Sequence, residues 1–450
     1  SGPPGHTPTM IRRLLYSRMD NSPLILFRMF YGVLLALECF GAIATGWGRR
    51  YLVEPEFTFT FIGFEWLQPL PGPGMYVYYA LMGLLGIAIA LGYRYRLSII
   101  LFTLLWTGTY LMQKTAYNNH YYLLILISGL MCFLPAHRAR SLDAKRRPEI
   151  RTDTMYTAVK WTVVLQLFIV YTYAAIAKIY DDWLDFSFIG LLMAGKADYP
   201  LIGTILQEPW VHRCIGLFGI AFDFLIIPLL LWKPTRKWAF GASIFFHLFN
   251  SVVFQIGIFP YLSLAFTAFF FEPETIRRTF FPTKAAGQWQ PPSGRPRYAG
   301  ILLGVGALYF TLQVFLPIRH YAIPGDVLWT EEGHRMSWRM MLRSRRGTIQ
   351  FRIVDKATGI SEPVKPENYL TPRQYRKVLA YPDFIWQFAQ YLKKSYARQG
   401  KDIAVYAAGN LRINRQPAAP FIDPEVDLAA EPWDHFRHHR WILPAPWELE

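Results

Sequence analysis

Charged residues and cysteines are scarce in this chain. Of its 450 residues, only 17% are Asp, Glu, Lys or Arg, whereas 53% are hydrophobic. Cys39, Cys132 and Cys214 all lie in or beside apolar segments, without the spacing of a disulfide framework, so we expect buried thiols. No Asn-x-Ser/Thr glycosylation acceptor occurs, which fits a bacterial membrane protein. The composition argues against a disulfide-rich secreted protein and is typical of a membrane protein.

Several common site signatures are also absent from the sequence. There is no metal-type cluster of ligands, no phosphate-cradling glycine loop and no serine nucleophile elbow. No cleavable signal peptide precedes the first apolar segment, and residues 1–9 are expected to be a cleavage scar and linker before a natural start at Met10. Chemistry is therefore expected from polar residues that interrupt the apolar segments, without a bound metal.

Long apolar runs dominate residues 10–316, which we interpret as a transmembrane domain. Nine segments can be drawn: Leu24–Thr45, Met75–Gly92, Leu97–Met112, His120–Pro135, Met155–Lys178, Cys214–Trp232, Trp238–Phe254, Gly257–Phe271 and Ala299–Leu316. Several are short for a full crossing, so tilt or partial burial is expected. The predicted fold is a polytopic α-helical membrane protein with about nine transmembrane segments and a C-terminal, strand-rich α+β extracytoplasmic domain.

The net charge of +16 lies largely in short loops between the apolar segments, so it predicts topology and no nucleic-acid partner. Basic residues concentrate in alternate loops: Arg12, Arg13 and Arg18; Arg94 and Arg96; Arg138, Arg140, Lys145, Arg146, Arg147 and Arg151; Lys233, Arg236 and Lys237; and Arg277, Arg278 and Lys284. Since basic loops stay in the cytoplasm, we expect a cytoplasmic N-terminus. The C-terminal domain would then be periplasmic in a bacterial inner membrane, or lumenal in the endoplasmic reticulum of a eukaryote.

Two loops on the other side, Phe57–Leu70 and Trp183–Trp210, are themselves aromatic and apolar. They are either interfacial segments anchored by Trp and Phe or the roof of a lipid-accessible cavity. Arg28 and Glu38 interrupt the first apolar segment, and both are expected to face the interior of the helix bundle.

Residues 317–450 have the character of a soluble domain. Thr348–Val354 alternates apolar and polar residues, which predicts a strand. Thr371 and Pro372 predict a helix start that continues to about Ala380, and a second helix is expected over Asp383–Arg398. Ile403–Ile413 predicts a strand, a hairpin or both.

Lys178 ends the apolar run Phe168–Trp183, just before the acidic Asp181 and Asp182. A lysine in hydrocarbon is costly, and apolar surroundings disfavour its charged form, so a neutral amine could serve as a general base. The alternative is that the side chain reaches the interface or pairs with Asp181 or Asp182. Position alone leaves both readings open.

Two further polar groups interrupt apolar segments. Asn118, Asn119 and His120 open the fourth segment, and the topology places them on the same side as Lys178. His247 and Asn250 are three residues apart and share a helix face. Each group is either part of one pocket with Lys178 or a structural cross-link between helices.

A basic cluster opens the C-terminal domain: Arg335, Arg339, Arg343, Arg345 and Arg346. The cluster is either a solvated or headgroup-binding face or a recognition surface for an acidic peptide.

Five segments carry a family resemblance across nearly all of the chain from about Leu24. They are YNNHYYL at Tyr117–Leu123, FIVYTYAAIAKIYDDW at Phe168–Trp183, FHLFNSVVFQIGIFPY at Phe246–Tyr261, SWRMMLRSR at Ser337–Arg345 and IDPEVDL at Ile422–Leu428. In their order and placement they resemble the vitamin K-dependent gamma-glutamyl carboxylases. Each motif is weak alone, but five in order are specific.

The resemblance implies a membrane enzyme that oxidises vitamin K hydroquinone, of phylloquinol or menaquinol type, to the epoxide with O₂. This reaction is coupled to carboxylation of glutamate side chains in a protein or peptide by CO₂. The family's base lysine corresponds to Lys178, which would deprotonate the hydroquinone so that oxygenation yields a strongly basic alkoxide. The family's histidine corresponds to His120, placed to stabilise or protonate the glutamyl carbanion.

The remaining site residues follow from the same resemblance. Asn118, Asn119, His247 and Asn250 would line the hydroquinone region, while Arg339, Arg343 and Arg345 would contact the peptide. Some features depart from the animal enzymes: only one lysine is retained at Ala177–Lys178, Arg339 stands where an acidic residue is expected, and the C-terminal domain is short.

These departures keep other functions open. One is a vitamin K hydroquinone epoxidase without peptide carboxylation. The others are a non-enzymatic lipid- or quinone-binding membrane protein and a transporter, although no transporter-like repeat with broken helices is evident. The partners expected are membrane lipid and a glutamate-containing substrate, and the sequence does not define an oligomeric state.

Overall fold

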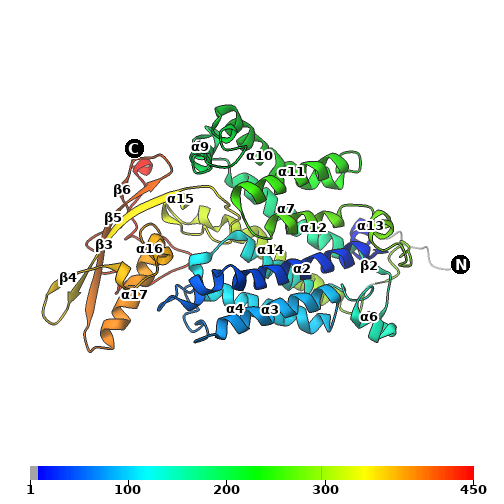
Figure 1. The fold of residues 1–450 in the computed structure, drawn as a ribbon, viewed down its shortest axis with the longest axis horizontal. Coiled ribbons are helices and arrows are strands. Elements are labelled where there is room, and N and C mark those ends of the chain that lie inside the picture. Colours follow the sequence, from blue (N-terminus) through cyan, green and yellow to red (C-terminus); the bar gives the residue numbers. More distant parts are fainter. Residues whose placement is uncertain (1–8, 295, 450) are drawn as a thin grey trace.

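The structure, a computed structural model, describes residues 9–294 and 296–449. Most of the predicted cleavage scar, residues 1–8, lies outside the described residues. Long helices form one elongated region, and a sheet with two helices lies at one end of it (Figure 1). The opposite end holds β2 (Thr154–Tyr156), α6 (Leu142–Arg146) and α13 (Pro273–Phe280) (Figure 1). Several of the predicted basic loops therefore gather at the end away from the C-terminal domain.

Each of the nine predicted apolar segments contains a helix. The main helices are α2 (Ser22–Ala44), α3 (Gly74–Leu91), α4 (Tyr95–Met112), α5 (Asn119–Met131), α7 (Thr157–Ala177), α10 (Pro209–Leu231), α11 (Arg236–Phe254), α12 (Phe259–Phe266) and α14 (Ala299–Phe315). Shorter helices are α1 (Met10–Tyr16), α8 (Asp181–Leu184), α9 (Ser187–Ala194) and α15 (Val327–Thr330), and β1 (Arg18–Asp20) pairs antiparallel with β2.

Five helices of the described chain are long and apolar enough to cross a membrane: Ser22–Ala44, Gly74–Leu91, Thr157–Ala177, Pro209–Leu231 and Ala299–Ala322. The other apolar helices are shorter or less apolar. The protein is therefore a helical membrane protein, but the predicted count of nine crossings is not confirmed.

α2 and α3 pack closely, backbone against backbone. A Cβ at Gly32 would lie 2.3 Å from the backbone nitrogen of Ala90, and one at Gly86 would lie 2.7 Å from that of Ala36. Glycine at both positions permits this backbone contact, as in other membrane helix pairs.

The charged residues of α2 face the protein, as predicted. Arg28 is fully buried and donates to the carbonyl oxygens of Ala136 at 2.7 Å and Arg140 at 2.6 Å. Glu38 is partly buried and lies beside the Tyr121 side chain and the Ile258 backbone. Each charge therefore has protein partners in place of lipid.

The C-terminal domain is built on a four-stranded antiparallel sheet with the order β4-β3-β5-β6. Its elements are β3 (Arg345–Asp355), β4 (Ser361–Val364), α16 (Pro372–Val378), α17 (Pro382–Ala397), β5 (Ile403–Ile413) and β6 (Ala419–Pro420). Thr371 caps α16 in a capping box with Gln374, as its position before Pro372 predicts. The predicted strands and helices of this domain are confirmed, and Ile403–Ile413 is one strand.

The loop Phe57–Leu70 joins the two regions. Phe59 is fully buried in the core of the C-terminal domain, 4.8 Å from the Phe384 ring, and the Gln387 amide donates to the Thr60 carbonyl at 2.8 Å. The first half of this loop is thus neither a membrane anchor nor a cavity roof, whereas exposed Trp66 and Leu70 fit the anchor reading for the second half.

The cysteine prediction holds only in part. Cys39 is buried, but Cys132 is partly exposed and Cys214 is exposed. All three are free thiols. The expectation of a buried thiol is therefore wrong for Cys214, which lies on α10 and lines a cavity instead of packing in the bundle core.

Candidate active site

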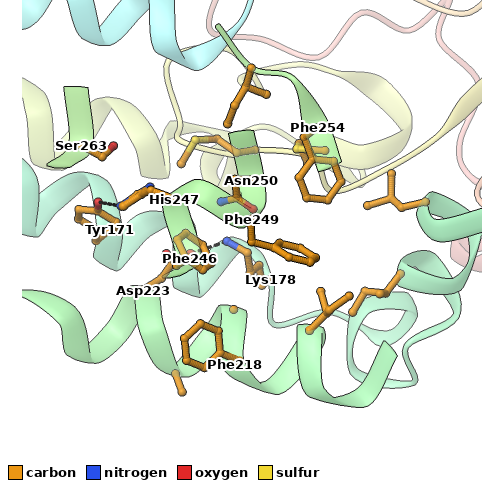
Figure 2. Close-up of a pocket in the computed structure, with 18 of the residues that line it drawn as sticks. Tyr171, Lys178, Phe218, Asp223, Phe246, His247, Phe249, Asn250, Phe254 and Ser263 are labelled. Atoms are coloured by element: carbon orange, nitrogen blue, oxygen red, sulfur yellow. Dashed lines mark hydrogen bonds and ion pairs between the residues drawn. The ribbon is translucent and has the colours of Figure 1, made fainter. Parts of the chain in front are cut away.

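A largely apolar cavity of about 740 Å³ lies among α7, α10, α11 and α12 (Figure 2). Its walls also include residues from α5, from α9 and from the chain that leads into β3. The polar side chains on these walls are His120, Tyr171, Lys178, Asp223, His247, Asn250 and Ser263. Trp183, Ile189 and Met193 form part of the wall, which supports the roof reading for the Trp183–Trp210 loop.

Exposed side chains of α10 and α11 form one border of the cavity. Leu217, Phe218 and Phe245 line it and are also exposed on the helix surface. The Phe218 and Phe245 rings, one from each helix, lie 6.2 Å apart edge to face. Since this surface belongs to apolar helices, a hydrophobic molecule could reach the cavity from lipid.

Lys178 follows directly after the last residue of α7 and points into the cavity (Figure 2). Its Nζ lies 2.5 Å from an Asp223 carboxylate oxygen on α10 and 3.3 Å from the Ala174 carbonyl oxygen. Both side chains are buried, with 11% and 6% of their surface exposed. The predicted alternative of pairing with Asp181 or Asp182 is not what the structure has: the carboxylate partner is Asp223.

His120 lies in the first turn of α5 and lines the same cavity. Asn118 starts this helix by accepting a hydrogen bond from the Tyr121 backbone at 2.8 Å. The His120 ring stacks on Phe259 with centroids 3.9 Å apart. The ring is therefore held in position by an aromatic contact, which leaves its nitrogens for other partners.

His247 forms a second polar contact in the cavity. Its Nε2 lies 3.2 Å from the Tyr171 hydroxyl, while its buried Nδ1 has no hydrogen-bond partner within the described residues (Figure 2). Asn250 lies one helical turn further along α11 and also lines the cavity. The predicted pairing of His247 and Asn250 on one helix face is thus present.

Asn118 and Asn119 do not line the cavity. Asn119 is buried, accepts a hydrogen bond from the Tyr117 hydroxyl at 3.1 Å and donates to the Arg339 carbonyl at 3.4 Å. Together with the cap made by Asn118, these contacts attach the start of α5 to the chain before β3. Both side chains support the position of His120.

The three arginines expected at a peptide site have different surroundings. Arg343 makes two hydrogen bonds of 2.7 Å to Glu331, and Arg345 lies 3.3 Å from the same carboxylate. Burial alone would raise the pKa of Glu331, but Arg343, His334 and Arg345 hold it well below its usual range. Arg343 and Arg345 are therefore committed to an internal ion pair.

Arg339 is less completely satisfied. It is buried, its Nε has no partner among the described residues, and it borders a second cavity of about 880 Å³. This second cavity lies between the end of α7 and the C-terminal domain and includes Asp181, Asp182 and Asp326. Met340 and Met341, the next two residues, border the first cavity. One short segment thus separates the two spaces.

Asp223 was not among the residues expected at the site. It is the single acidic residue of the apolar segment Cys214–Trp232, so it carries the same signal that identified Arg28 and Glu38. The sequence could not show that it meets Lys178, because 45 residues separate the two. Within residues 9–294 and 296–449, no three His, Cys, Asp or Glu side chains are grouped as metal ligands would be.

The fold and this cavity define a helical membrane protein with a buried polar site and a C-terminal domain at one end. Residues 16–274 match the family model described as HTTM domain, and residues 298–448 match the one described as vitamin K-dependent gamma-carboxylase, lumenal domain. No solved structure matches the chain. The protein belongs to the vitamin K-dependent gamma-carboxylase family.

Proposed function

We propose that this protein is an integral membrane carboxylase that couples oxidation of vitamin K hydroquinone by O₂ to carboxylation of glutamate side chains by CO₂. The products are the vitamin K epoxide and gamma-carboxyglutamate. The observation that carries the proposal is the presence of Lys178 and His120 on the walls of one apolar cavity, with Asp223 bound to the lysine.

The cavity suits a hydroquinone with a hydrophobic tail. Phe218, Phe246 and Phe254 supply aromatic walls, and the exposed apolar border formed by α10 and α11 would let the tail extend toward lipid. Lys178 and the unpartnered His247 Nδ1 are polar groups that two ring hydroxyls could contact. When bound, the hydroquinone supplies the reducing equivalents for O₂ and, on oxidation, the strong base that the glutamate side chain requires.

Lys178 and Asp223 would act as one proton-accepting unit. An ammonium group in an ion pair has no free lone pair, so it cannot accept a proton. Transfer of a proton to Asp223 leaves a neutral amine and a neutral acid, and an apolar cavity disfavours the separated charges. The amine of Lys178 then takes the hydroquinone proton, while Asp223, the positioning residue, keeps the proton that it received from Lys178.

His120 would serve the glutamate half of the reaction. It lies in the first turn of α5, lines the cavity, and its ring is fixed by Phe259. A neutral imidazole can donate or accept a proton according to its tautomer, so it can stabilise or protonate the glutamyl carbanion. Its neighbours Asn118 and Asn119 keep it in place from outside the cavity.

The peptide would approach through the second cavity. Arg339 is the predicted peptide residue that remains available there, since Glu331 occupies Arg343 and Arg345. On the topology inferred from loop charge, this side faces the periplasm or the lumen, and the N-terminus faces the cytoplasm. The hydroquinone then arrives from lipid and the peptide from water.

Purified full-length protein with vitamin K hydroquinone, O₂, labelled CO₂ and a glutamate-containing peptide tests the proposal. Epoxide and labelled peptide should both form, and Lys178→Ala should abolish both. His120→Ala should reduce labelling more than epoxide formation. Equal loss of both products in His120→Ala would remove the role given to this histidine.

The same assay separates the alternatives. Epoxide without labelled peptide would identify a hydroquinone epoxidase, which the occupied Arg343 and Arg345 would help to explain. Hydroquinone binding without either product would identify a quinone-binding protein. Full epoxide formation by Lys178→Ala would show that the base has been assigned wrongly.

A further inference from the structure

A third cavity, of about 410 Å³, lies at the end of the bundle away from the C-terminal domain, near α6 (Figure 1). It is formed by the turn between α3 and α4 and by the loop that follows α5. Its lining residues are Arg94, Arg96, Leu97, His137, Asp143, Arg146 and Arg147, and we call it the arginine pocket. None of these residues belongs to the candidate active site.

The backbone of the arginine pocket is held by specific contacts. Asp143 accepts hydrogen bonds from the backbone nitrogens of Arg94 at 2.7 Å and Tyr95 at 2.8 Å, and its own nitrogen donates to the Gly92 carbonyl at 3.0 Å. Gly92 has φ +65°, and a Cβ there would lie 2.3 Å from the Ser141 Cβ. Glycine therefore allows the turn and the loop to meet and form the pocket.

The positive charge of the arginine pocket is largely uncompensated. Arg94, Arg146 and Arg147 form no ion pair in the described part of the chain, and all three are exposed. The one carboxylate of the pocket, Asp143, already accepts the two backbone hydrogen bonds given above. Four guanidinium groups therefore surround a space whose acidic group is engaged by backbone donors.

His137 provides an independent sign that a ligand belongs here. It lines the arginine pocket, only 6% of its surface is exposed, and its Nδ1 has no hydrogen-bond partner among the described residues. Its ring stacks on Tyr95 with centroids 5.4 Å apart, so it is held in place. Burial, Arg96 and Arg138 lower the pKa of His137 to about 4. A buried polar atom without a partner is uncommon and is accounted for by an unseen ligand or water.

The surroundings of the arginine pocket favour a lipid. α3 is one of the membrane-length helices and ends at Leu91, directly before this turn. Leu91 and Leu97 are more than half exposed, and Tyr93 is also exposed between them. Arginine groups beside an apolar surface at a helix end are the arrangement that binds anionic headgroups.

We propose that the arginine pocket binds a phosphate-bearing anion, supplied by the headgroup of an anionic phospholipid. The phosphate is held by the guanidinium groups of Arg94, Arg146 and Arg147, and His137 supplies a further polar contact from inside the pocket. The acyl chains lie along the apolar surface at Leu91 and Leu97. Free inorganic phosphate has the same chemistry and is the other source that the experiment must separate.

Native mass spectrometry of the full-length protein measures binding of phosphatidylglycerol against phosphatidylcholine. The variant is the double substitution R146Q/R147Q. Its matched control is K145Q/R151Q, which removes the same charge from exposed residues of the same loop that do not line the pocket. We expect phosphatidylglycerol affinity to fall roughly 30-fold in the pocket variant. The control should change it by less than about threefold.

His137→Gln tests the interior of the pocket and should weaken phosphatidylglycerol binding severalfold. Inorganic phosphate is then added as a competitor. If phosphate displaces the lipid, the site is open to both sources; if it does not, the site is specific for lipid. Either outcome supports the proposal. Equal binding of the two lipids, equal losses in the two double variants, or unchanged binding in His137→Gln would each overturn the proposal.

Discussion

Two of the buried lysine–aspartate pairs in the described chain lie in very different surroundings. Lys114 and Asp383 lie 2.7 Å apart where the loop between α4 and α5 meets α17, and Lys178 and Asp223 lie 2.5 Å apart in the cavity. The first pair has further ionic and polar partners, because Arg335 lies 2.6 Å from Asp383 and Gln387 accepts from Lys114 at 2.6 Å. In the second pair, the described residues give Lys178 one further hydrogen-bond acceptor, the Ala174 carbonyl oxygen, and its Nζ lies 5.5 Å from the centroid of the Trp183 ring.

The difference between the pairs separates structure from chemistry. A buried ion pair that has several ionic and hydrogen-bonding partners holds two parts of the protein together and has little reason to change its protonation. A pair with few partners, beside an apolar cavity, can pass a proton to a bound molecule. We therefore assign Lys114–Asp383 to the joint between bundle and C-terminal domain, and Lys178–Asp223 to the proposed reaction.

The largest effect on activity is expected when the aspartate of each pair is replaced by asparagine and epoxide formation is compared. Asp223→Asn removes the acceptor that frees the Lys178 amine, so epoxide formation per folded molecule should fall by about 10²–10⁴-fold. Asp383→Asn, assayed at low temperature, should stay within a few-fold of the unchanged protein. A similar loss of activity in both variants would mean that Asp223 acts on folding and not on proton transfer.

The free energy of unfolding should rank the two variants in the opposite order, with Asp383→Asn the more destabilised. Asp383→Asn leaves Lys114 and Arg335 buried without their carboxylate, which should cost about 3–5 kcal/mol of unfolding free energy. Thermal unfolding of the detergent-solubilised protein measures the loss. Asp402→Asn is the control, because Asp402 is 70% exposed and its ion pair with Lys356 lies on the surface. This control should leave the melting temperature unchanged within about a degree.

The pH dependence of the joint follows from Asp383. Burial alone would raise the pKa of Asp383, but Arg335 and Lys114 hold it well below its usual range. Because the pKa is depressed in the folded state, its stabilisation is fully present above the unfolded value of about 3.9 and is lost as pH falls further. The melting-temperature gap to Asp383→Asn should be constant from about pH 7 to 5 and narrow only below about pH 4. A gap that already narrows near neutral pH would point to another group.

The smallest effect on activity is expected at the contact between the Tyr171 hydroxyl and His247 in the cavity. Tyr171→Phe removes the hydroxyl 3.2 Å from His247 and keeps the ring. Since a neutral hydrogen bond is worth about 1 kcal/mol, the hydroquinone KM should rise severalfold with little change in kcat. Tyr173→Phe, on the exposed side of α7, is the matched control and should leave both constants unchanged. A large fall in kcat for Tyr171→Phe would give this tyrosine a part in the proton transfer.

Much of the architecture could be predicted because it depends on local pattern. Apolar runs of sufficient length form helices in a membrane, so all nine predicted segments are helical. Thr371 and Pro372 identify a helix start by their chemistry alone, and alternation over Thr348–Val354 identifies β3. The crossing count was less certain because α5 and α12 are apolar but short.

The candidate site was harder to predict because its parts come from distant segments. The motif around Asn118 was recognised, but whether each asparagine faces the cavity depends on how α5 packs on the chain before β3. Arg343 and Arg345 looked available for a peptide because nothing near them in the sequence marks Glu331 as their partner. Whether a side chain is free is a property of tertiary contacts.

The sequence alone was enough to predict a helical membrane protein with a strand-containing C-terminal region, and it identified Lys178 and His120 as candidate site residues. These conclusions rest on hydrophobic length, local helix and strand signals, and motif order, which the chain carries without its fold. The folded structure was needed to show that Lys178 pairs with Asp223, that His120 lines the same cavity, and that two of the three arginines are already paired. Pairing and burial depend on which helices meet, and that depends on packing along the whole chain.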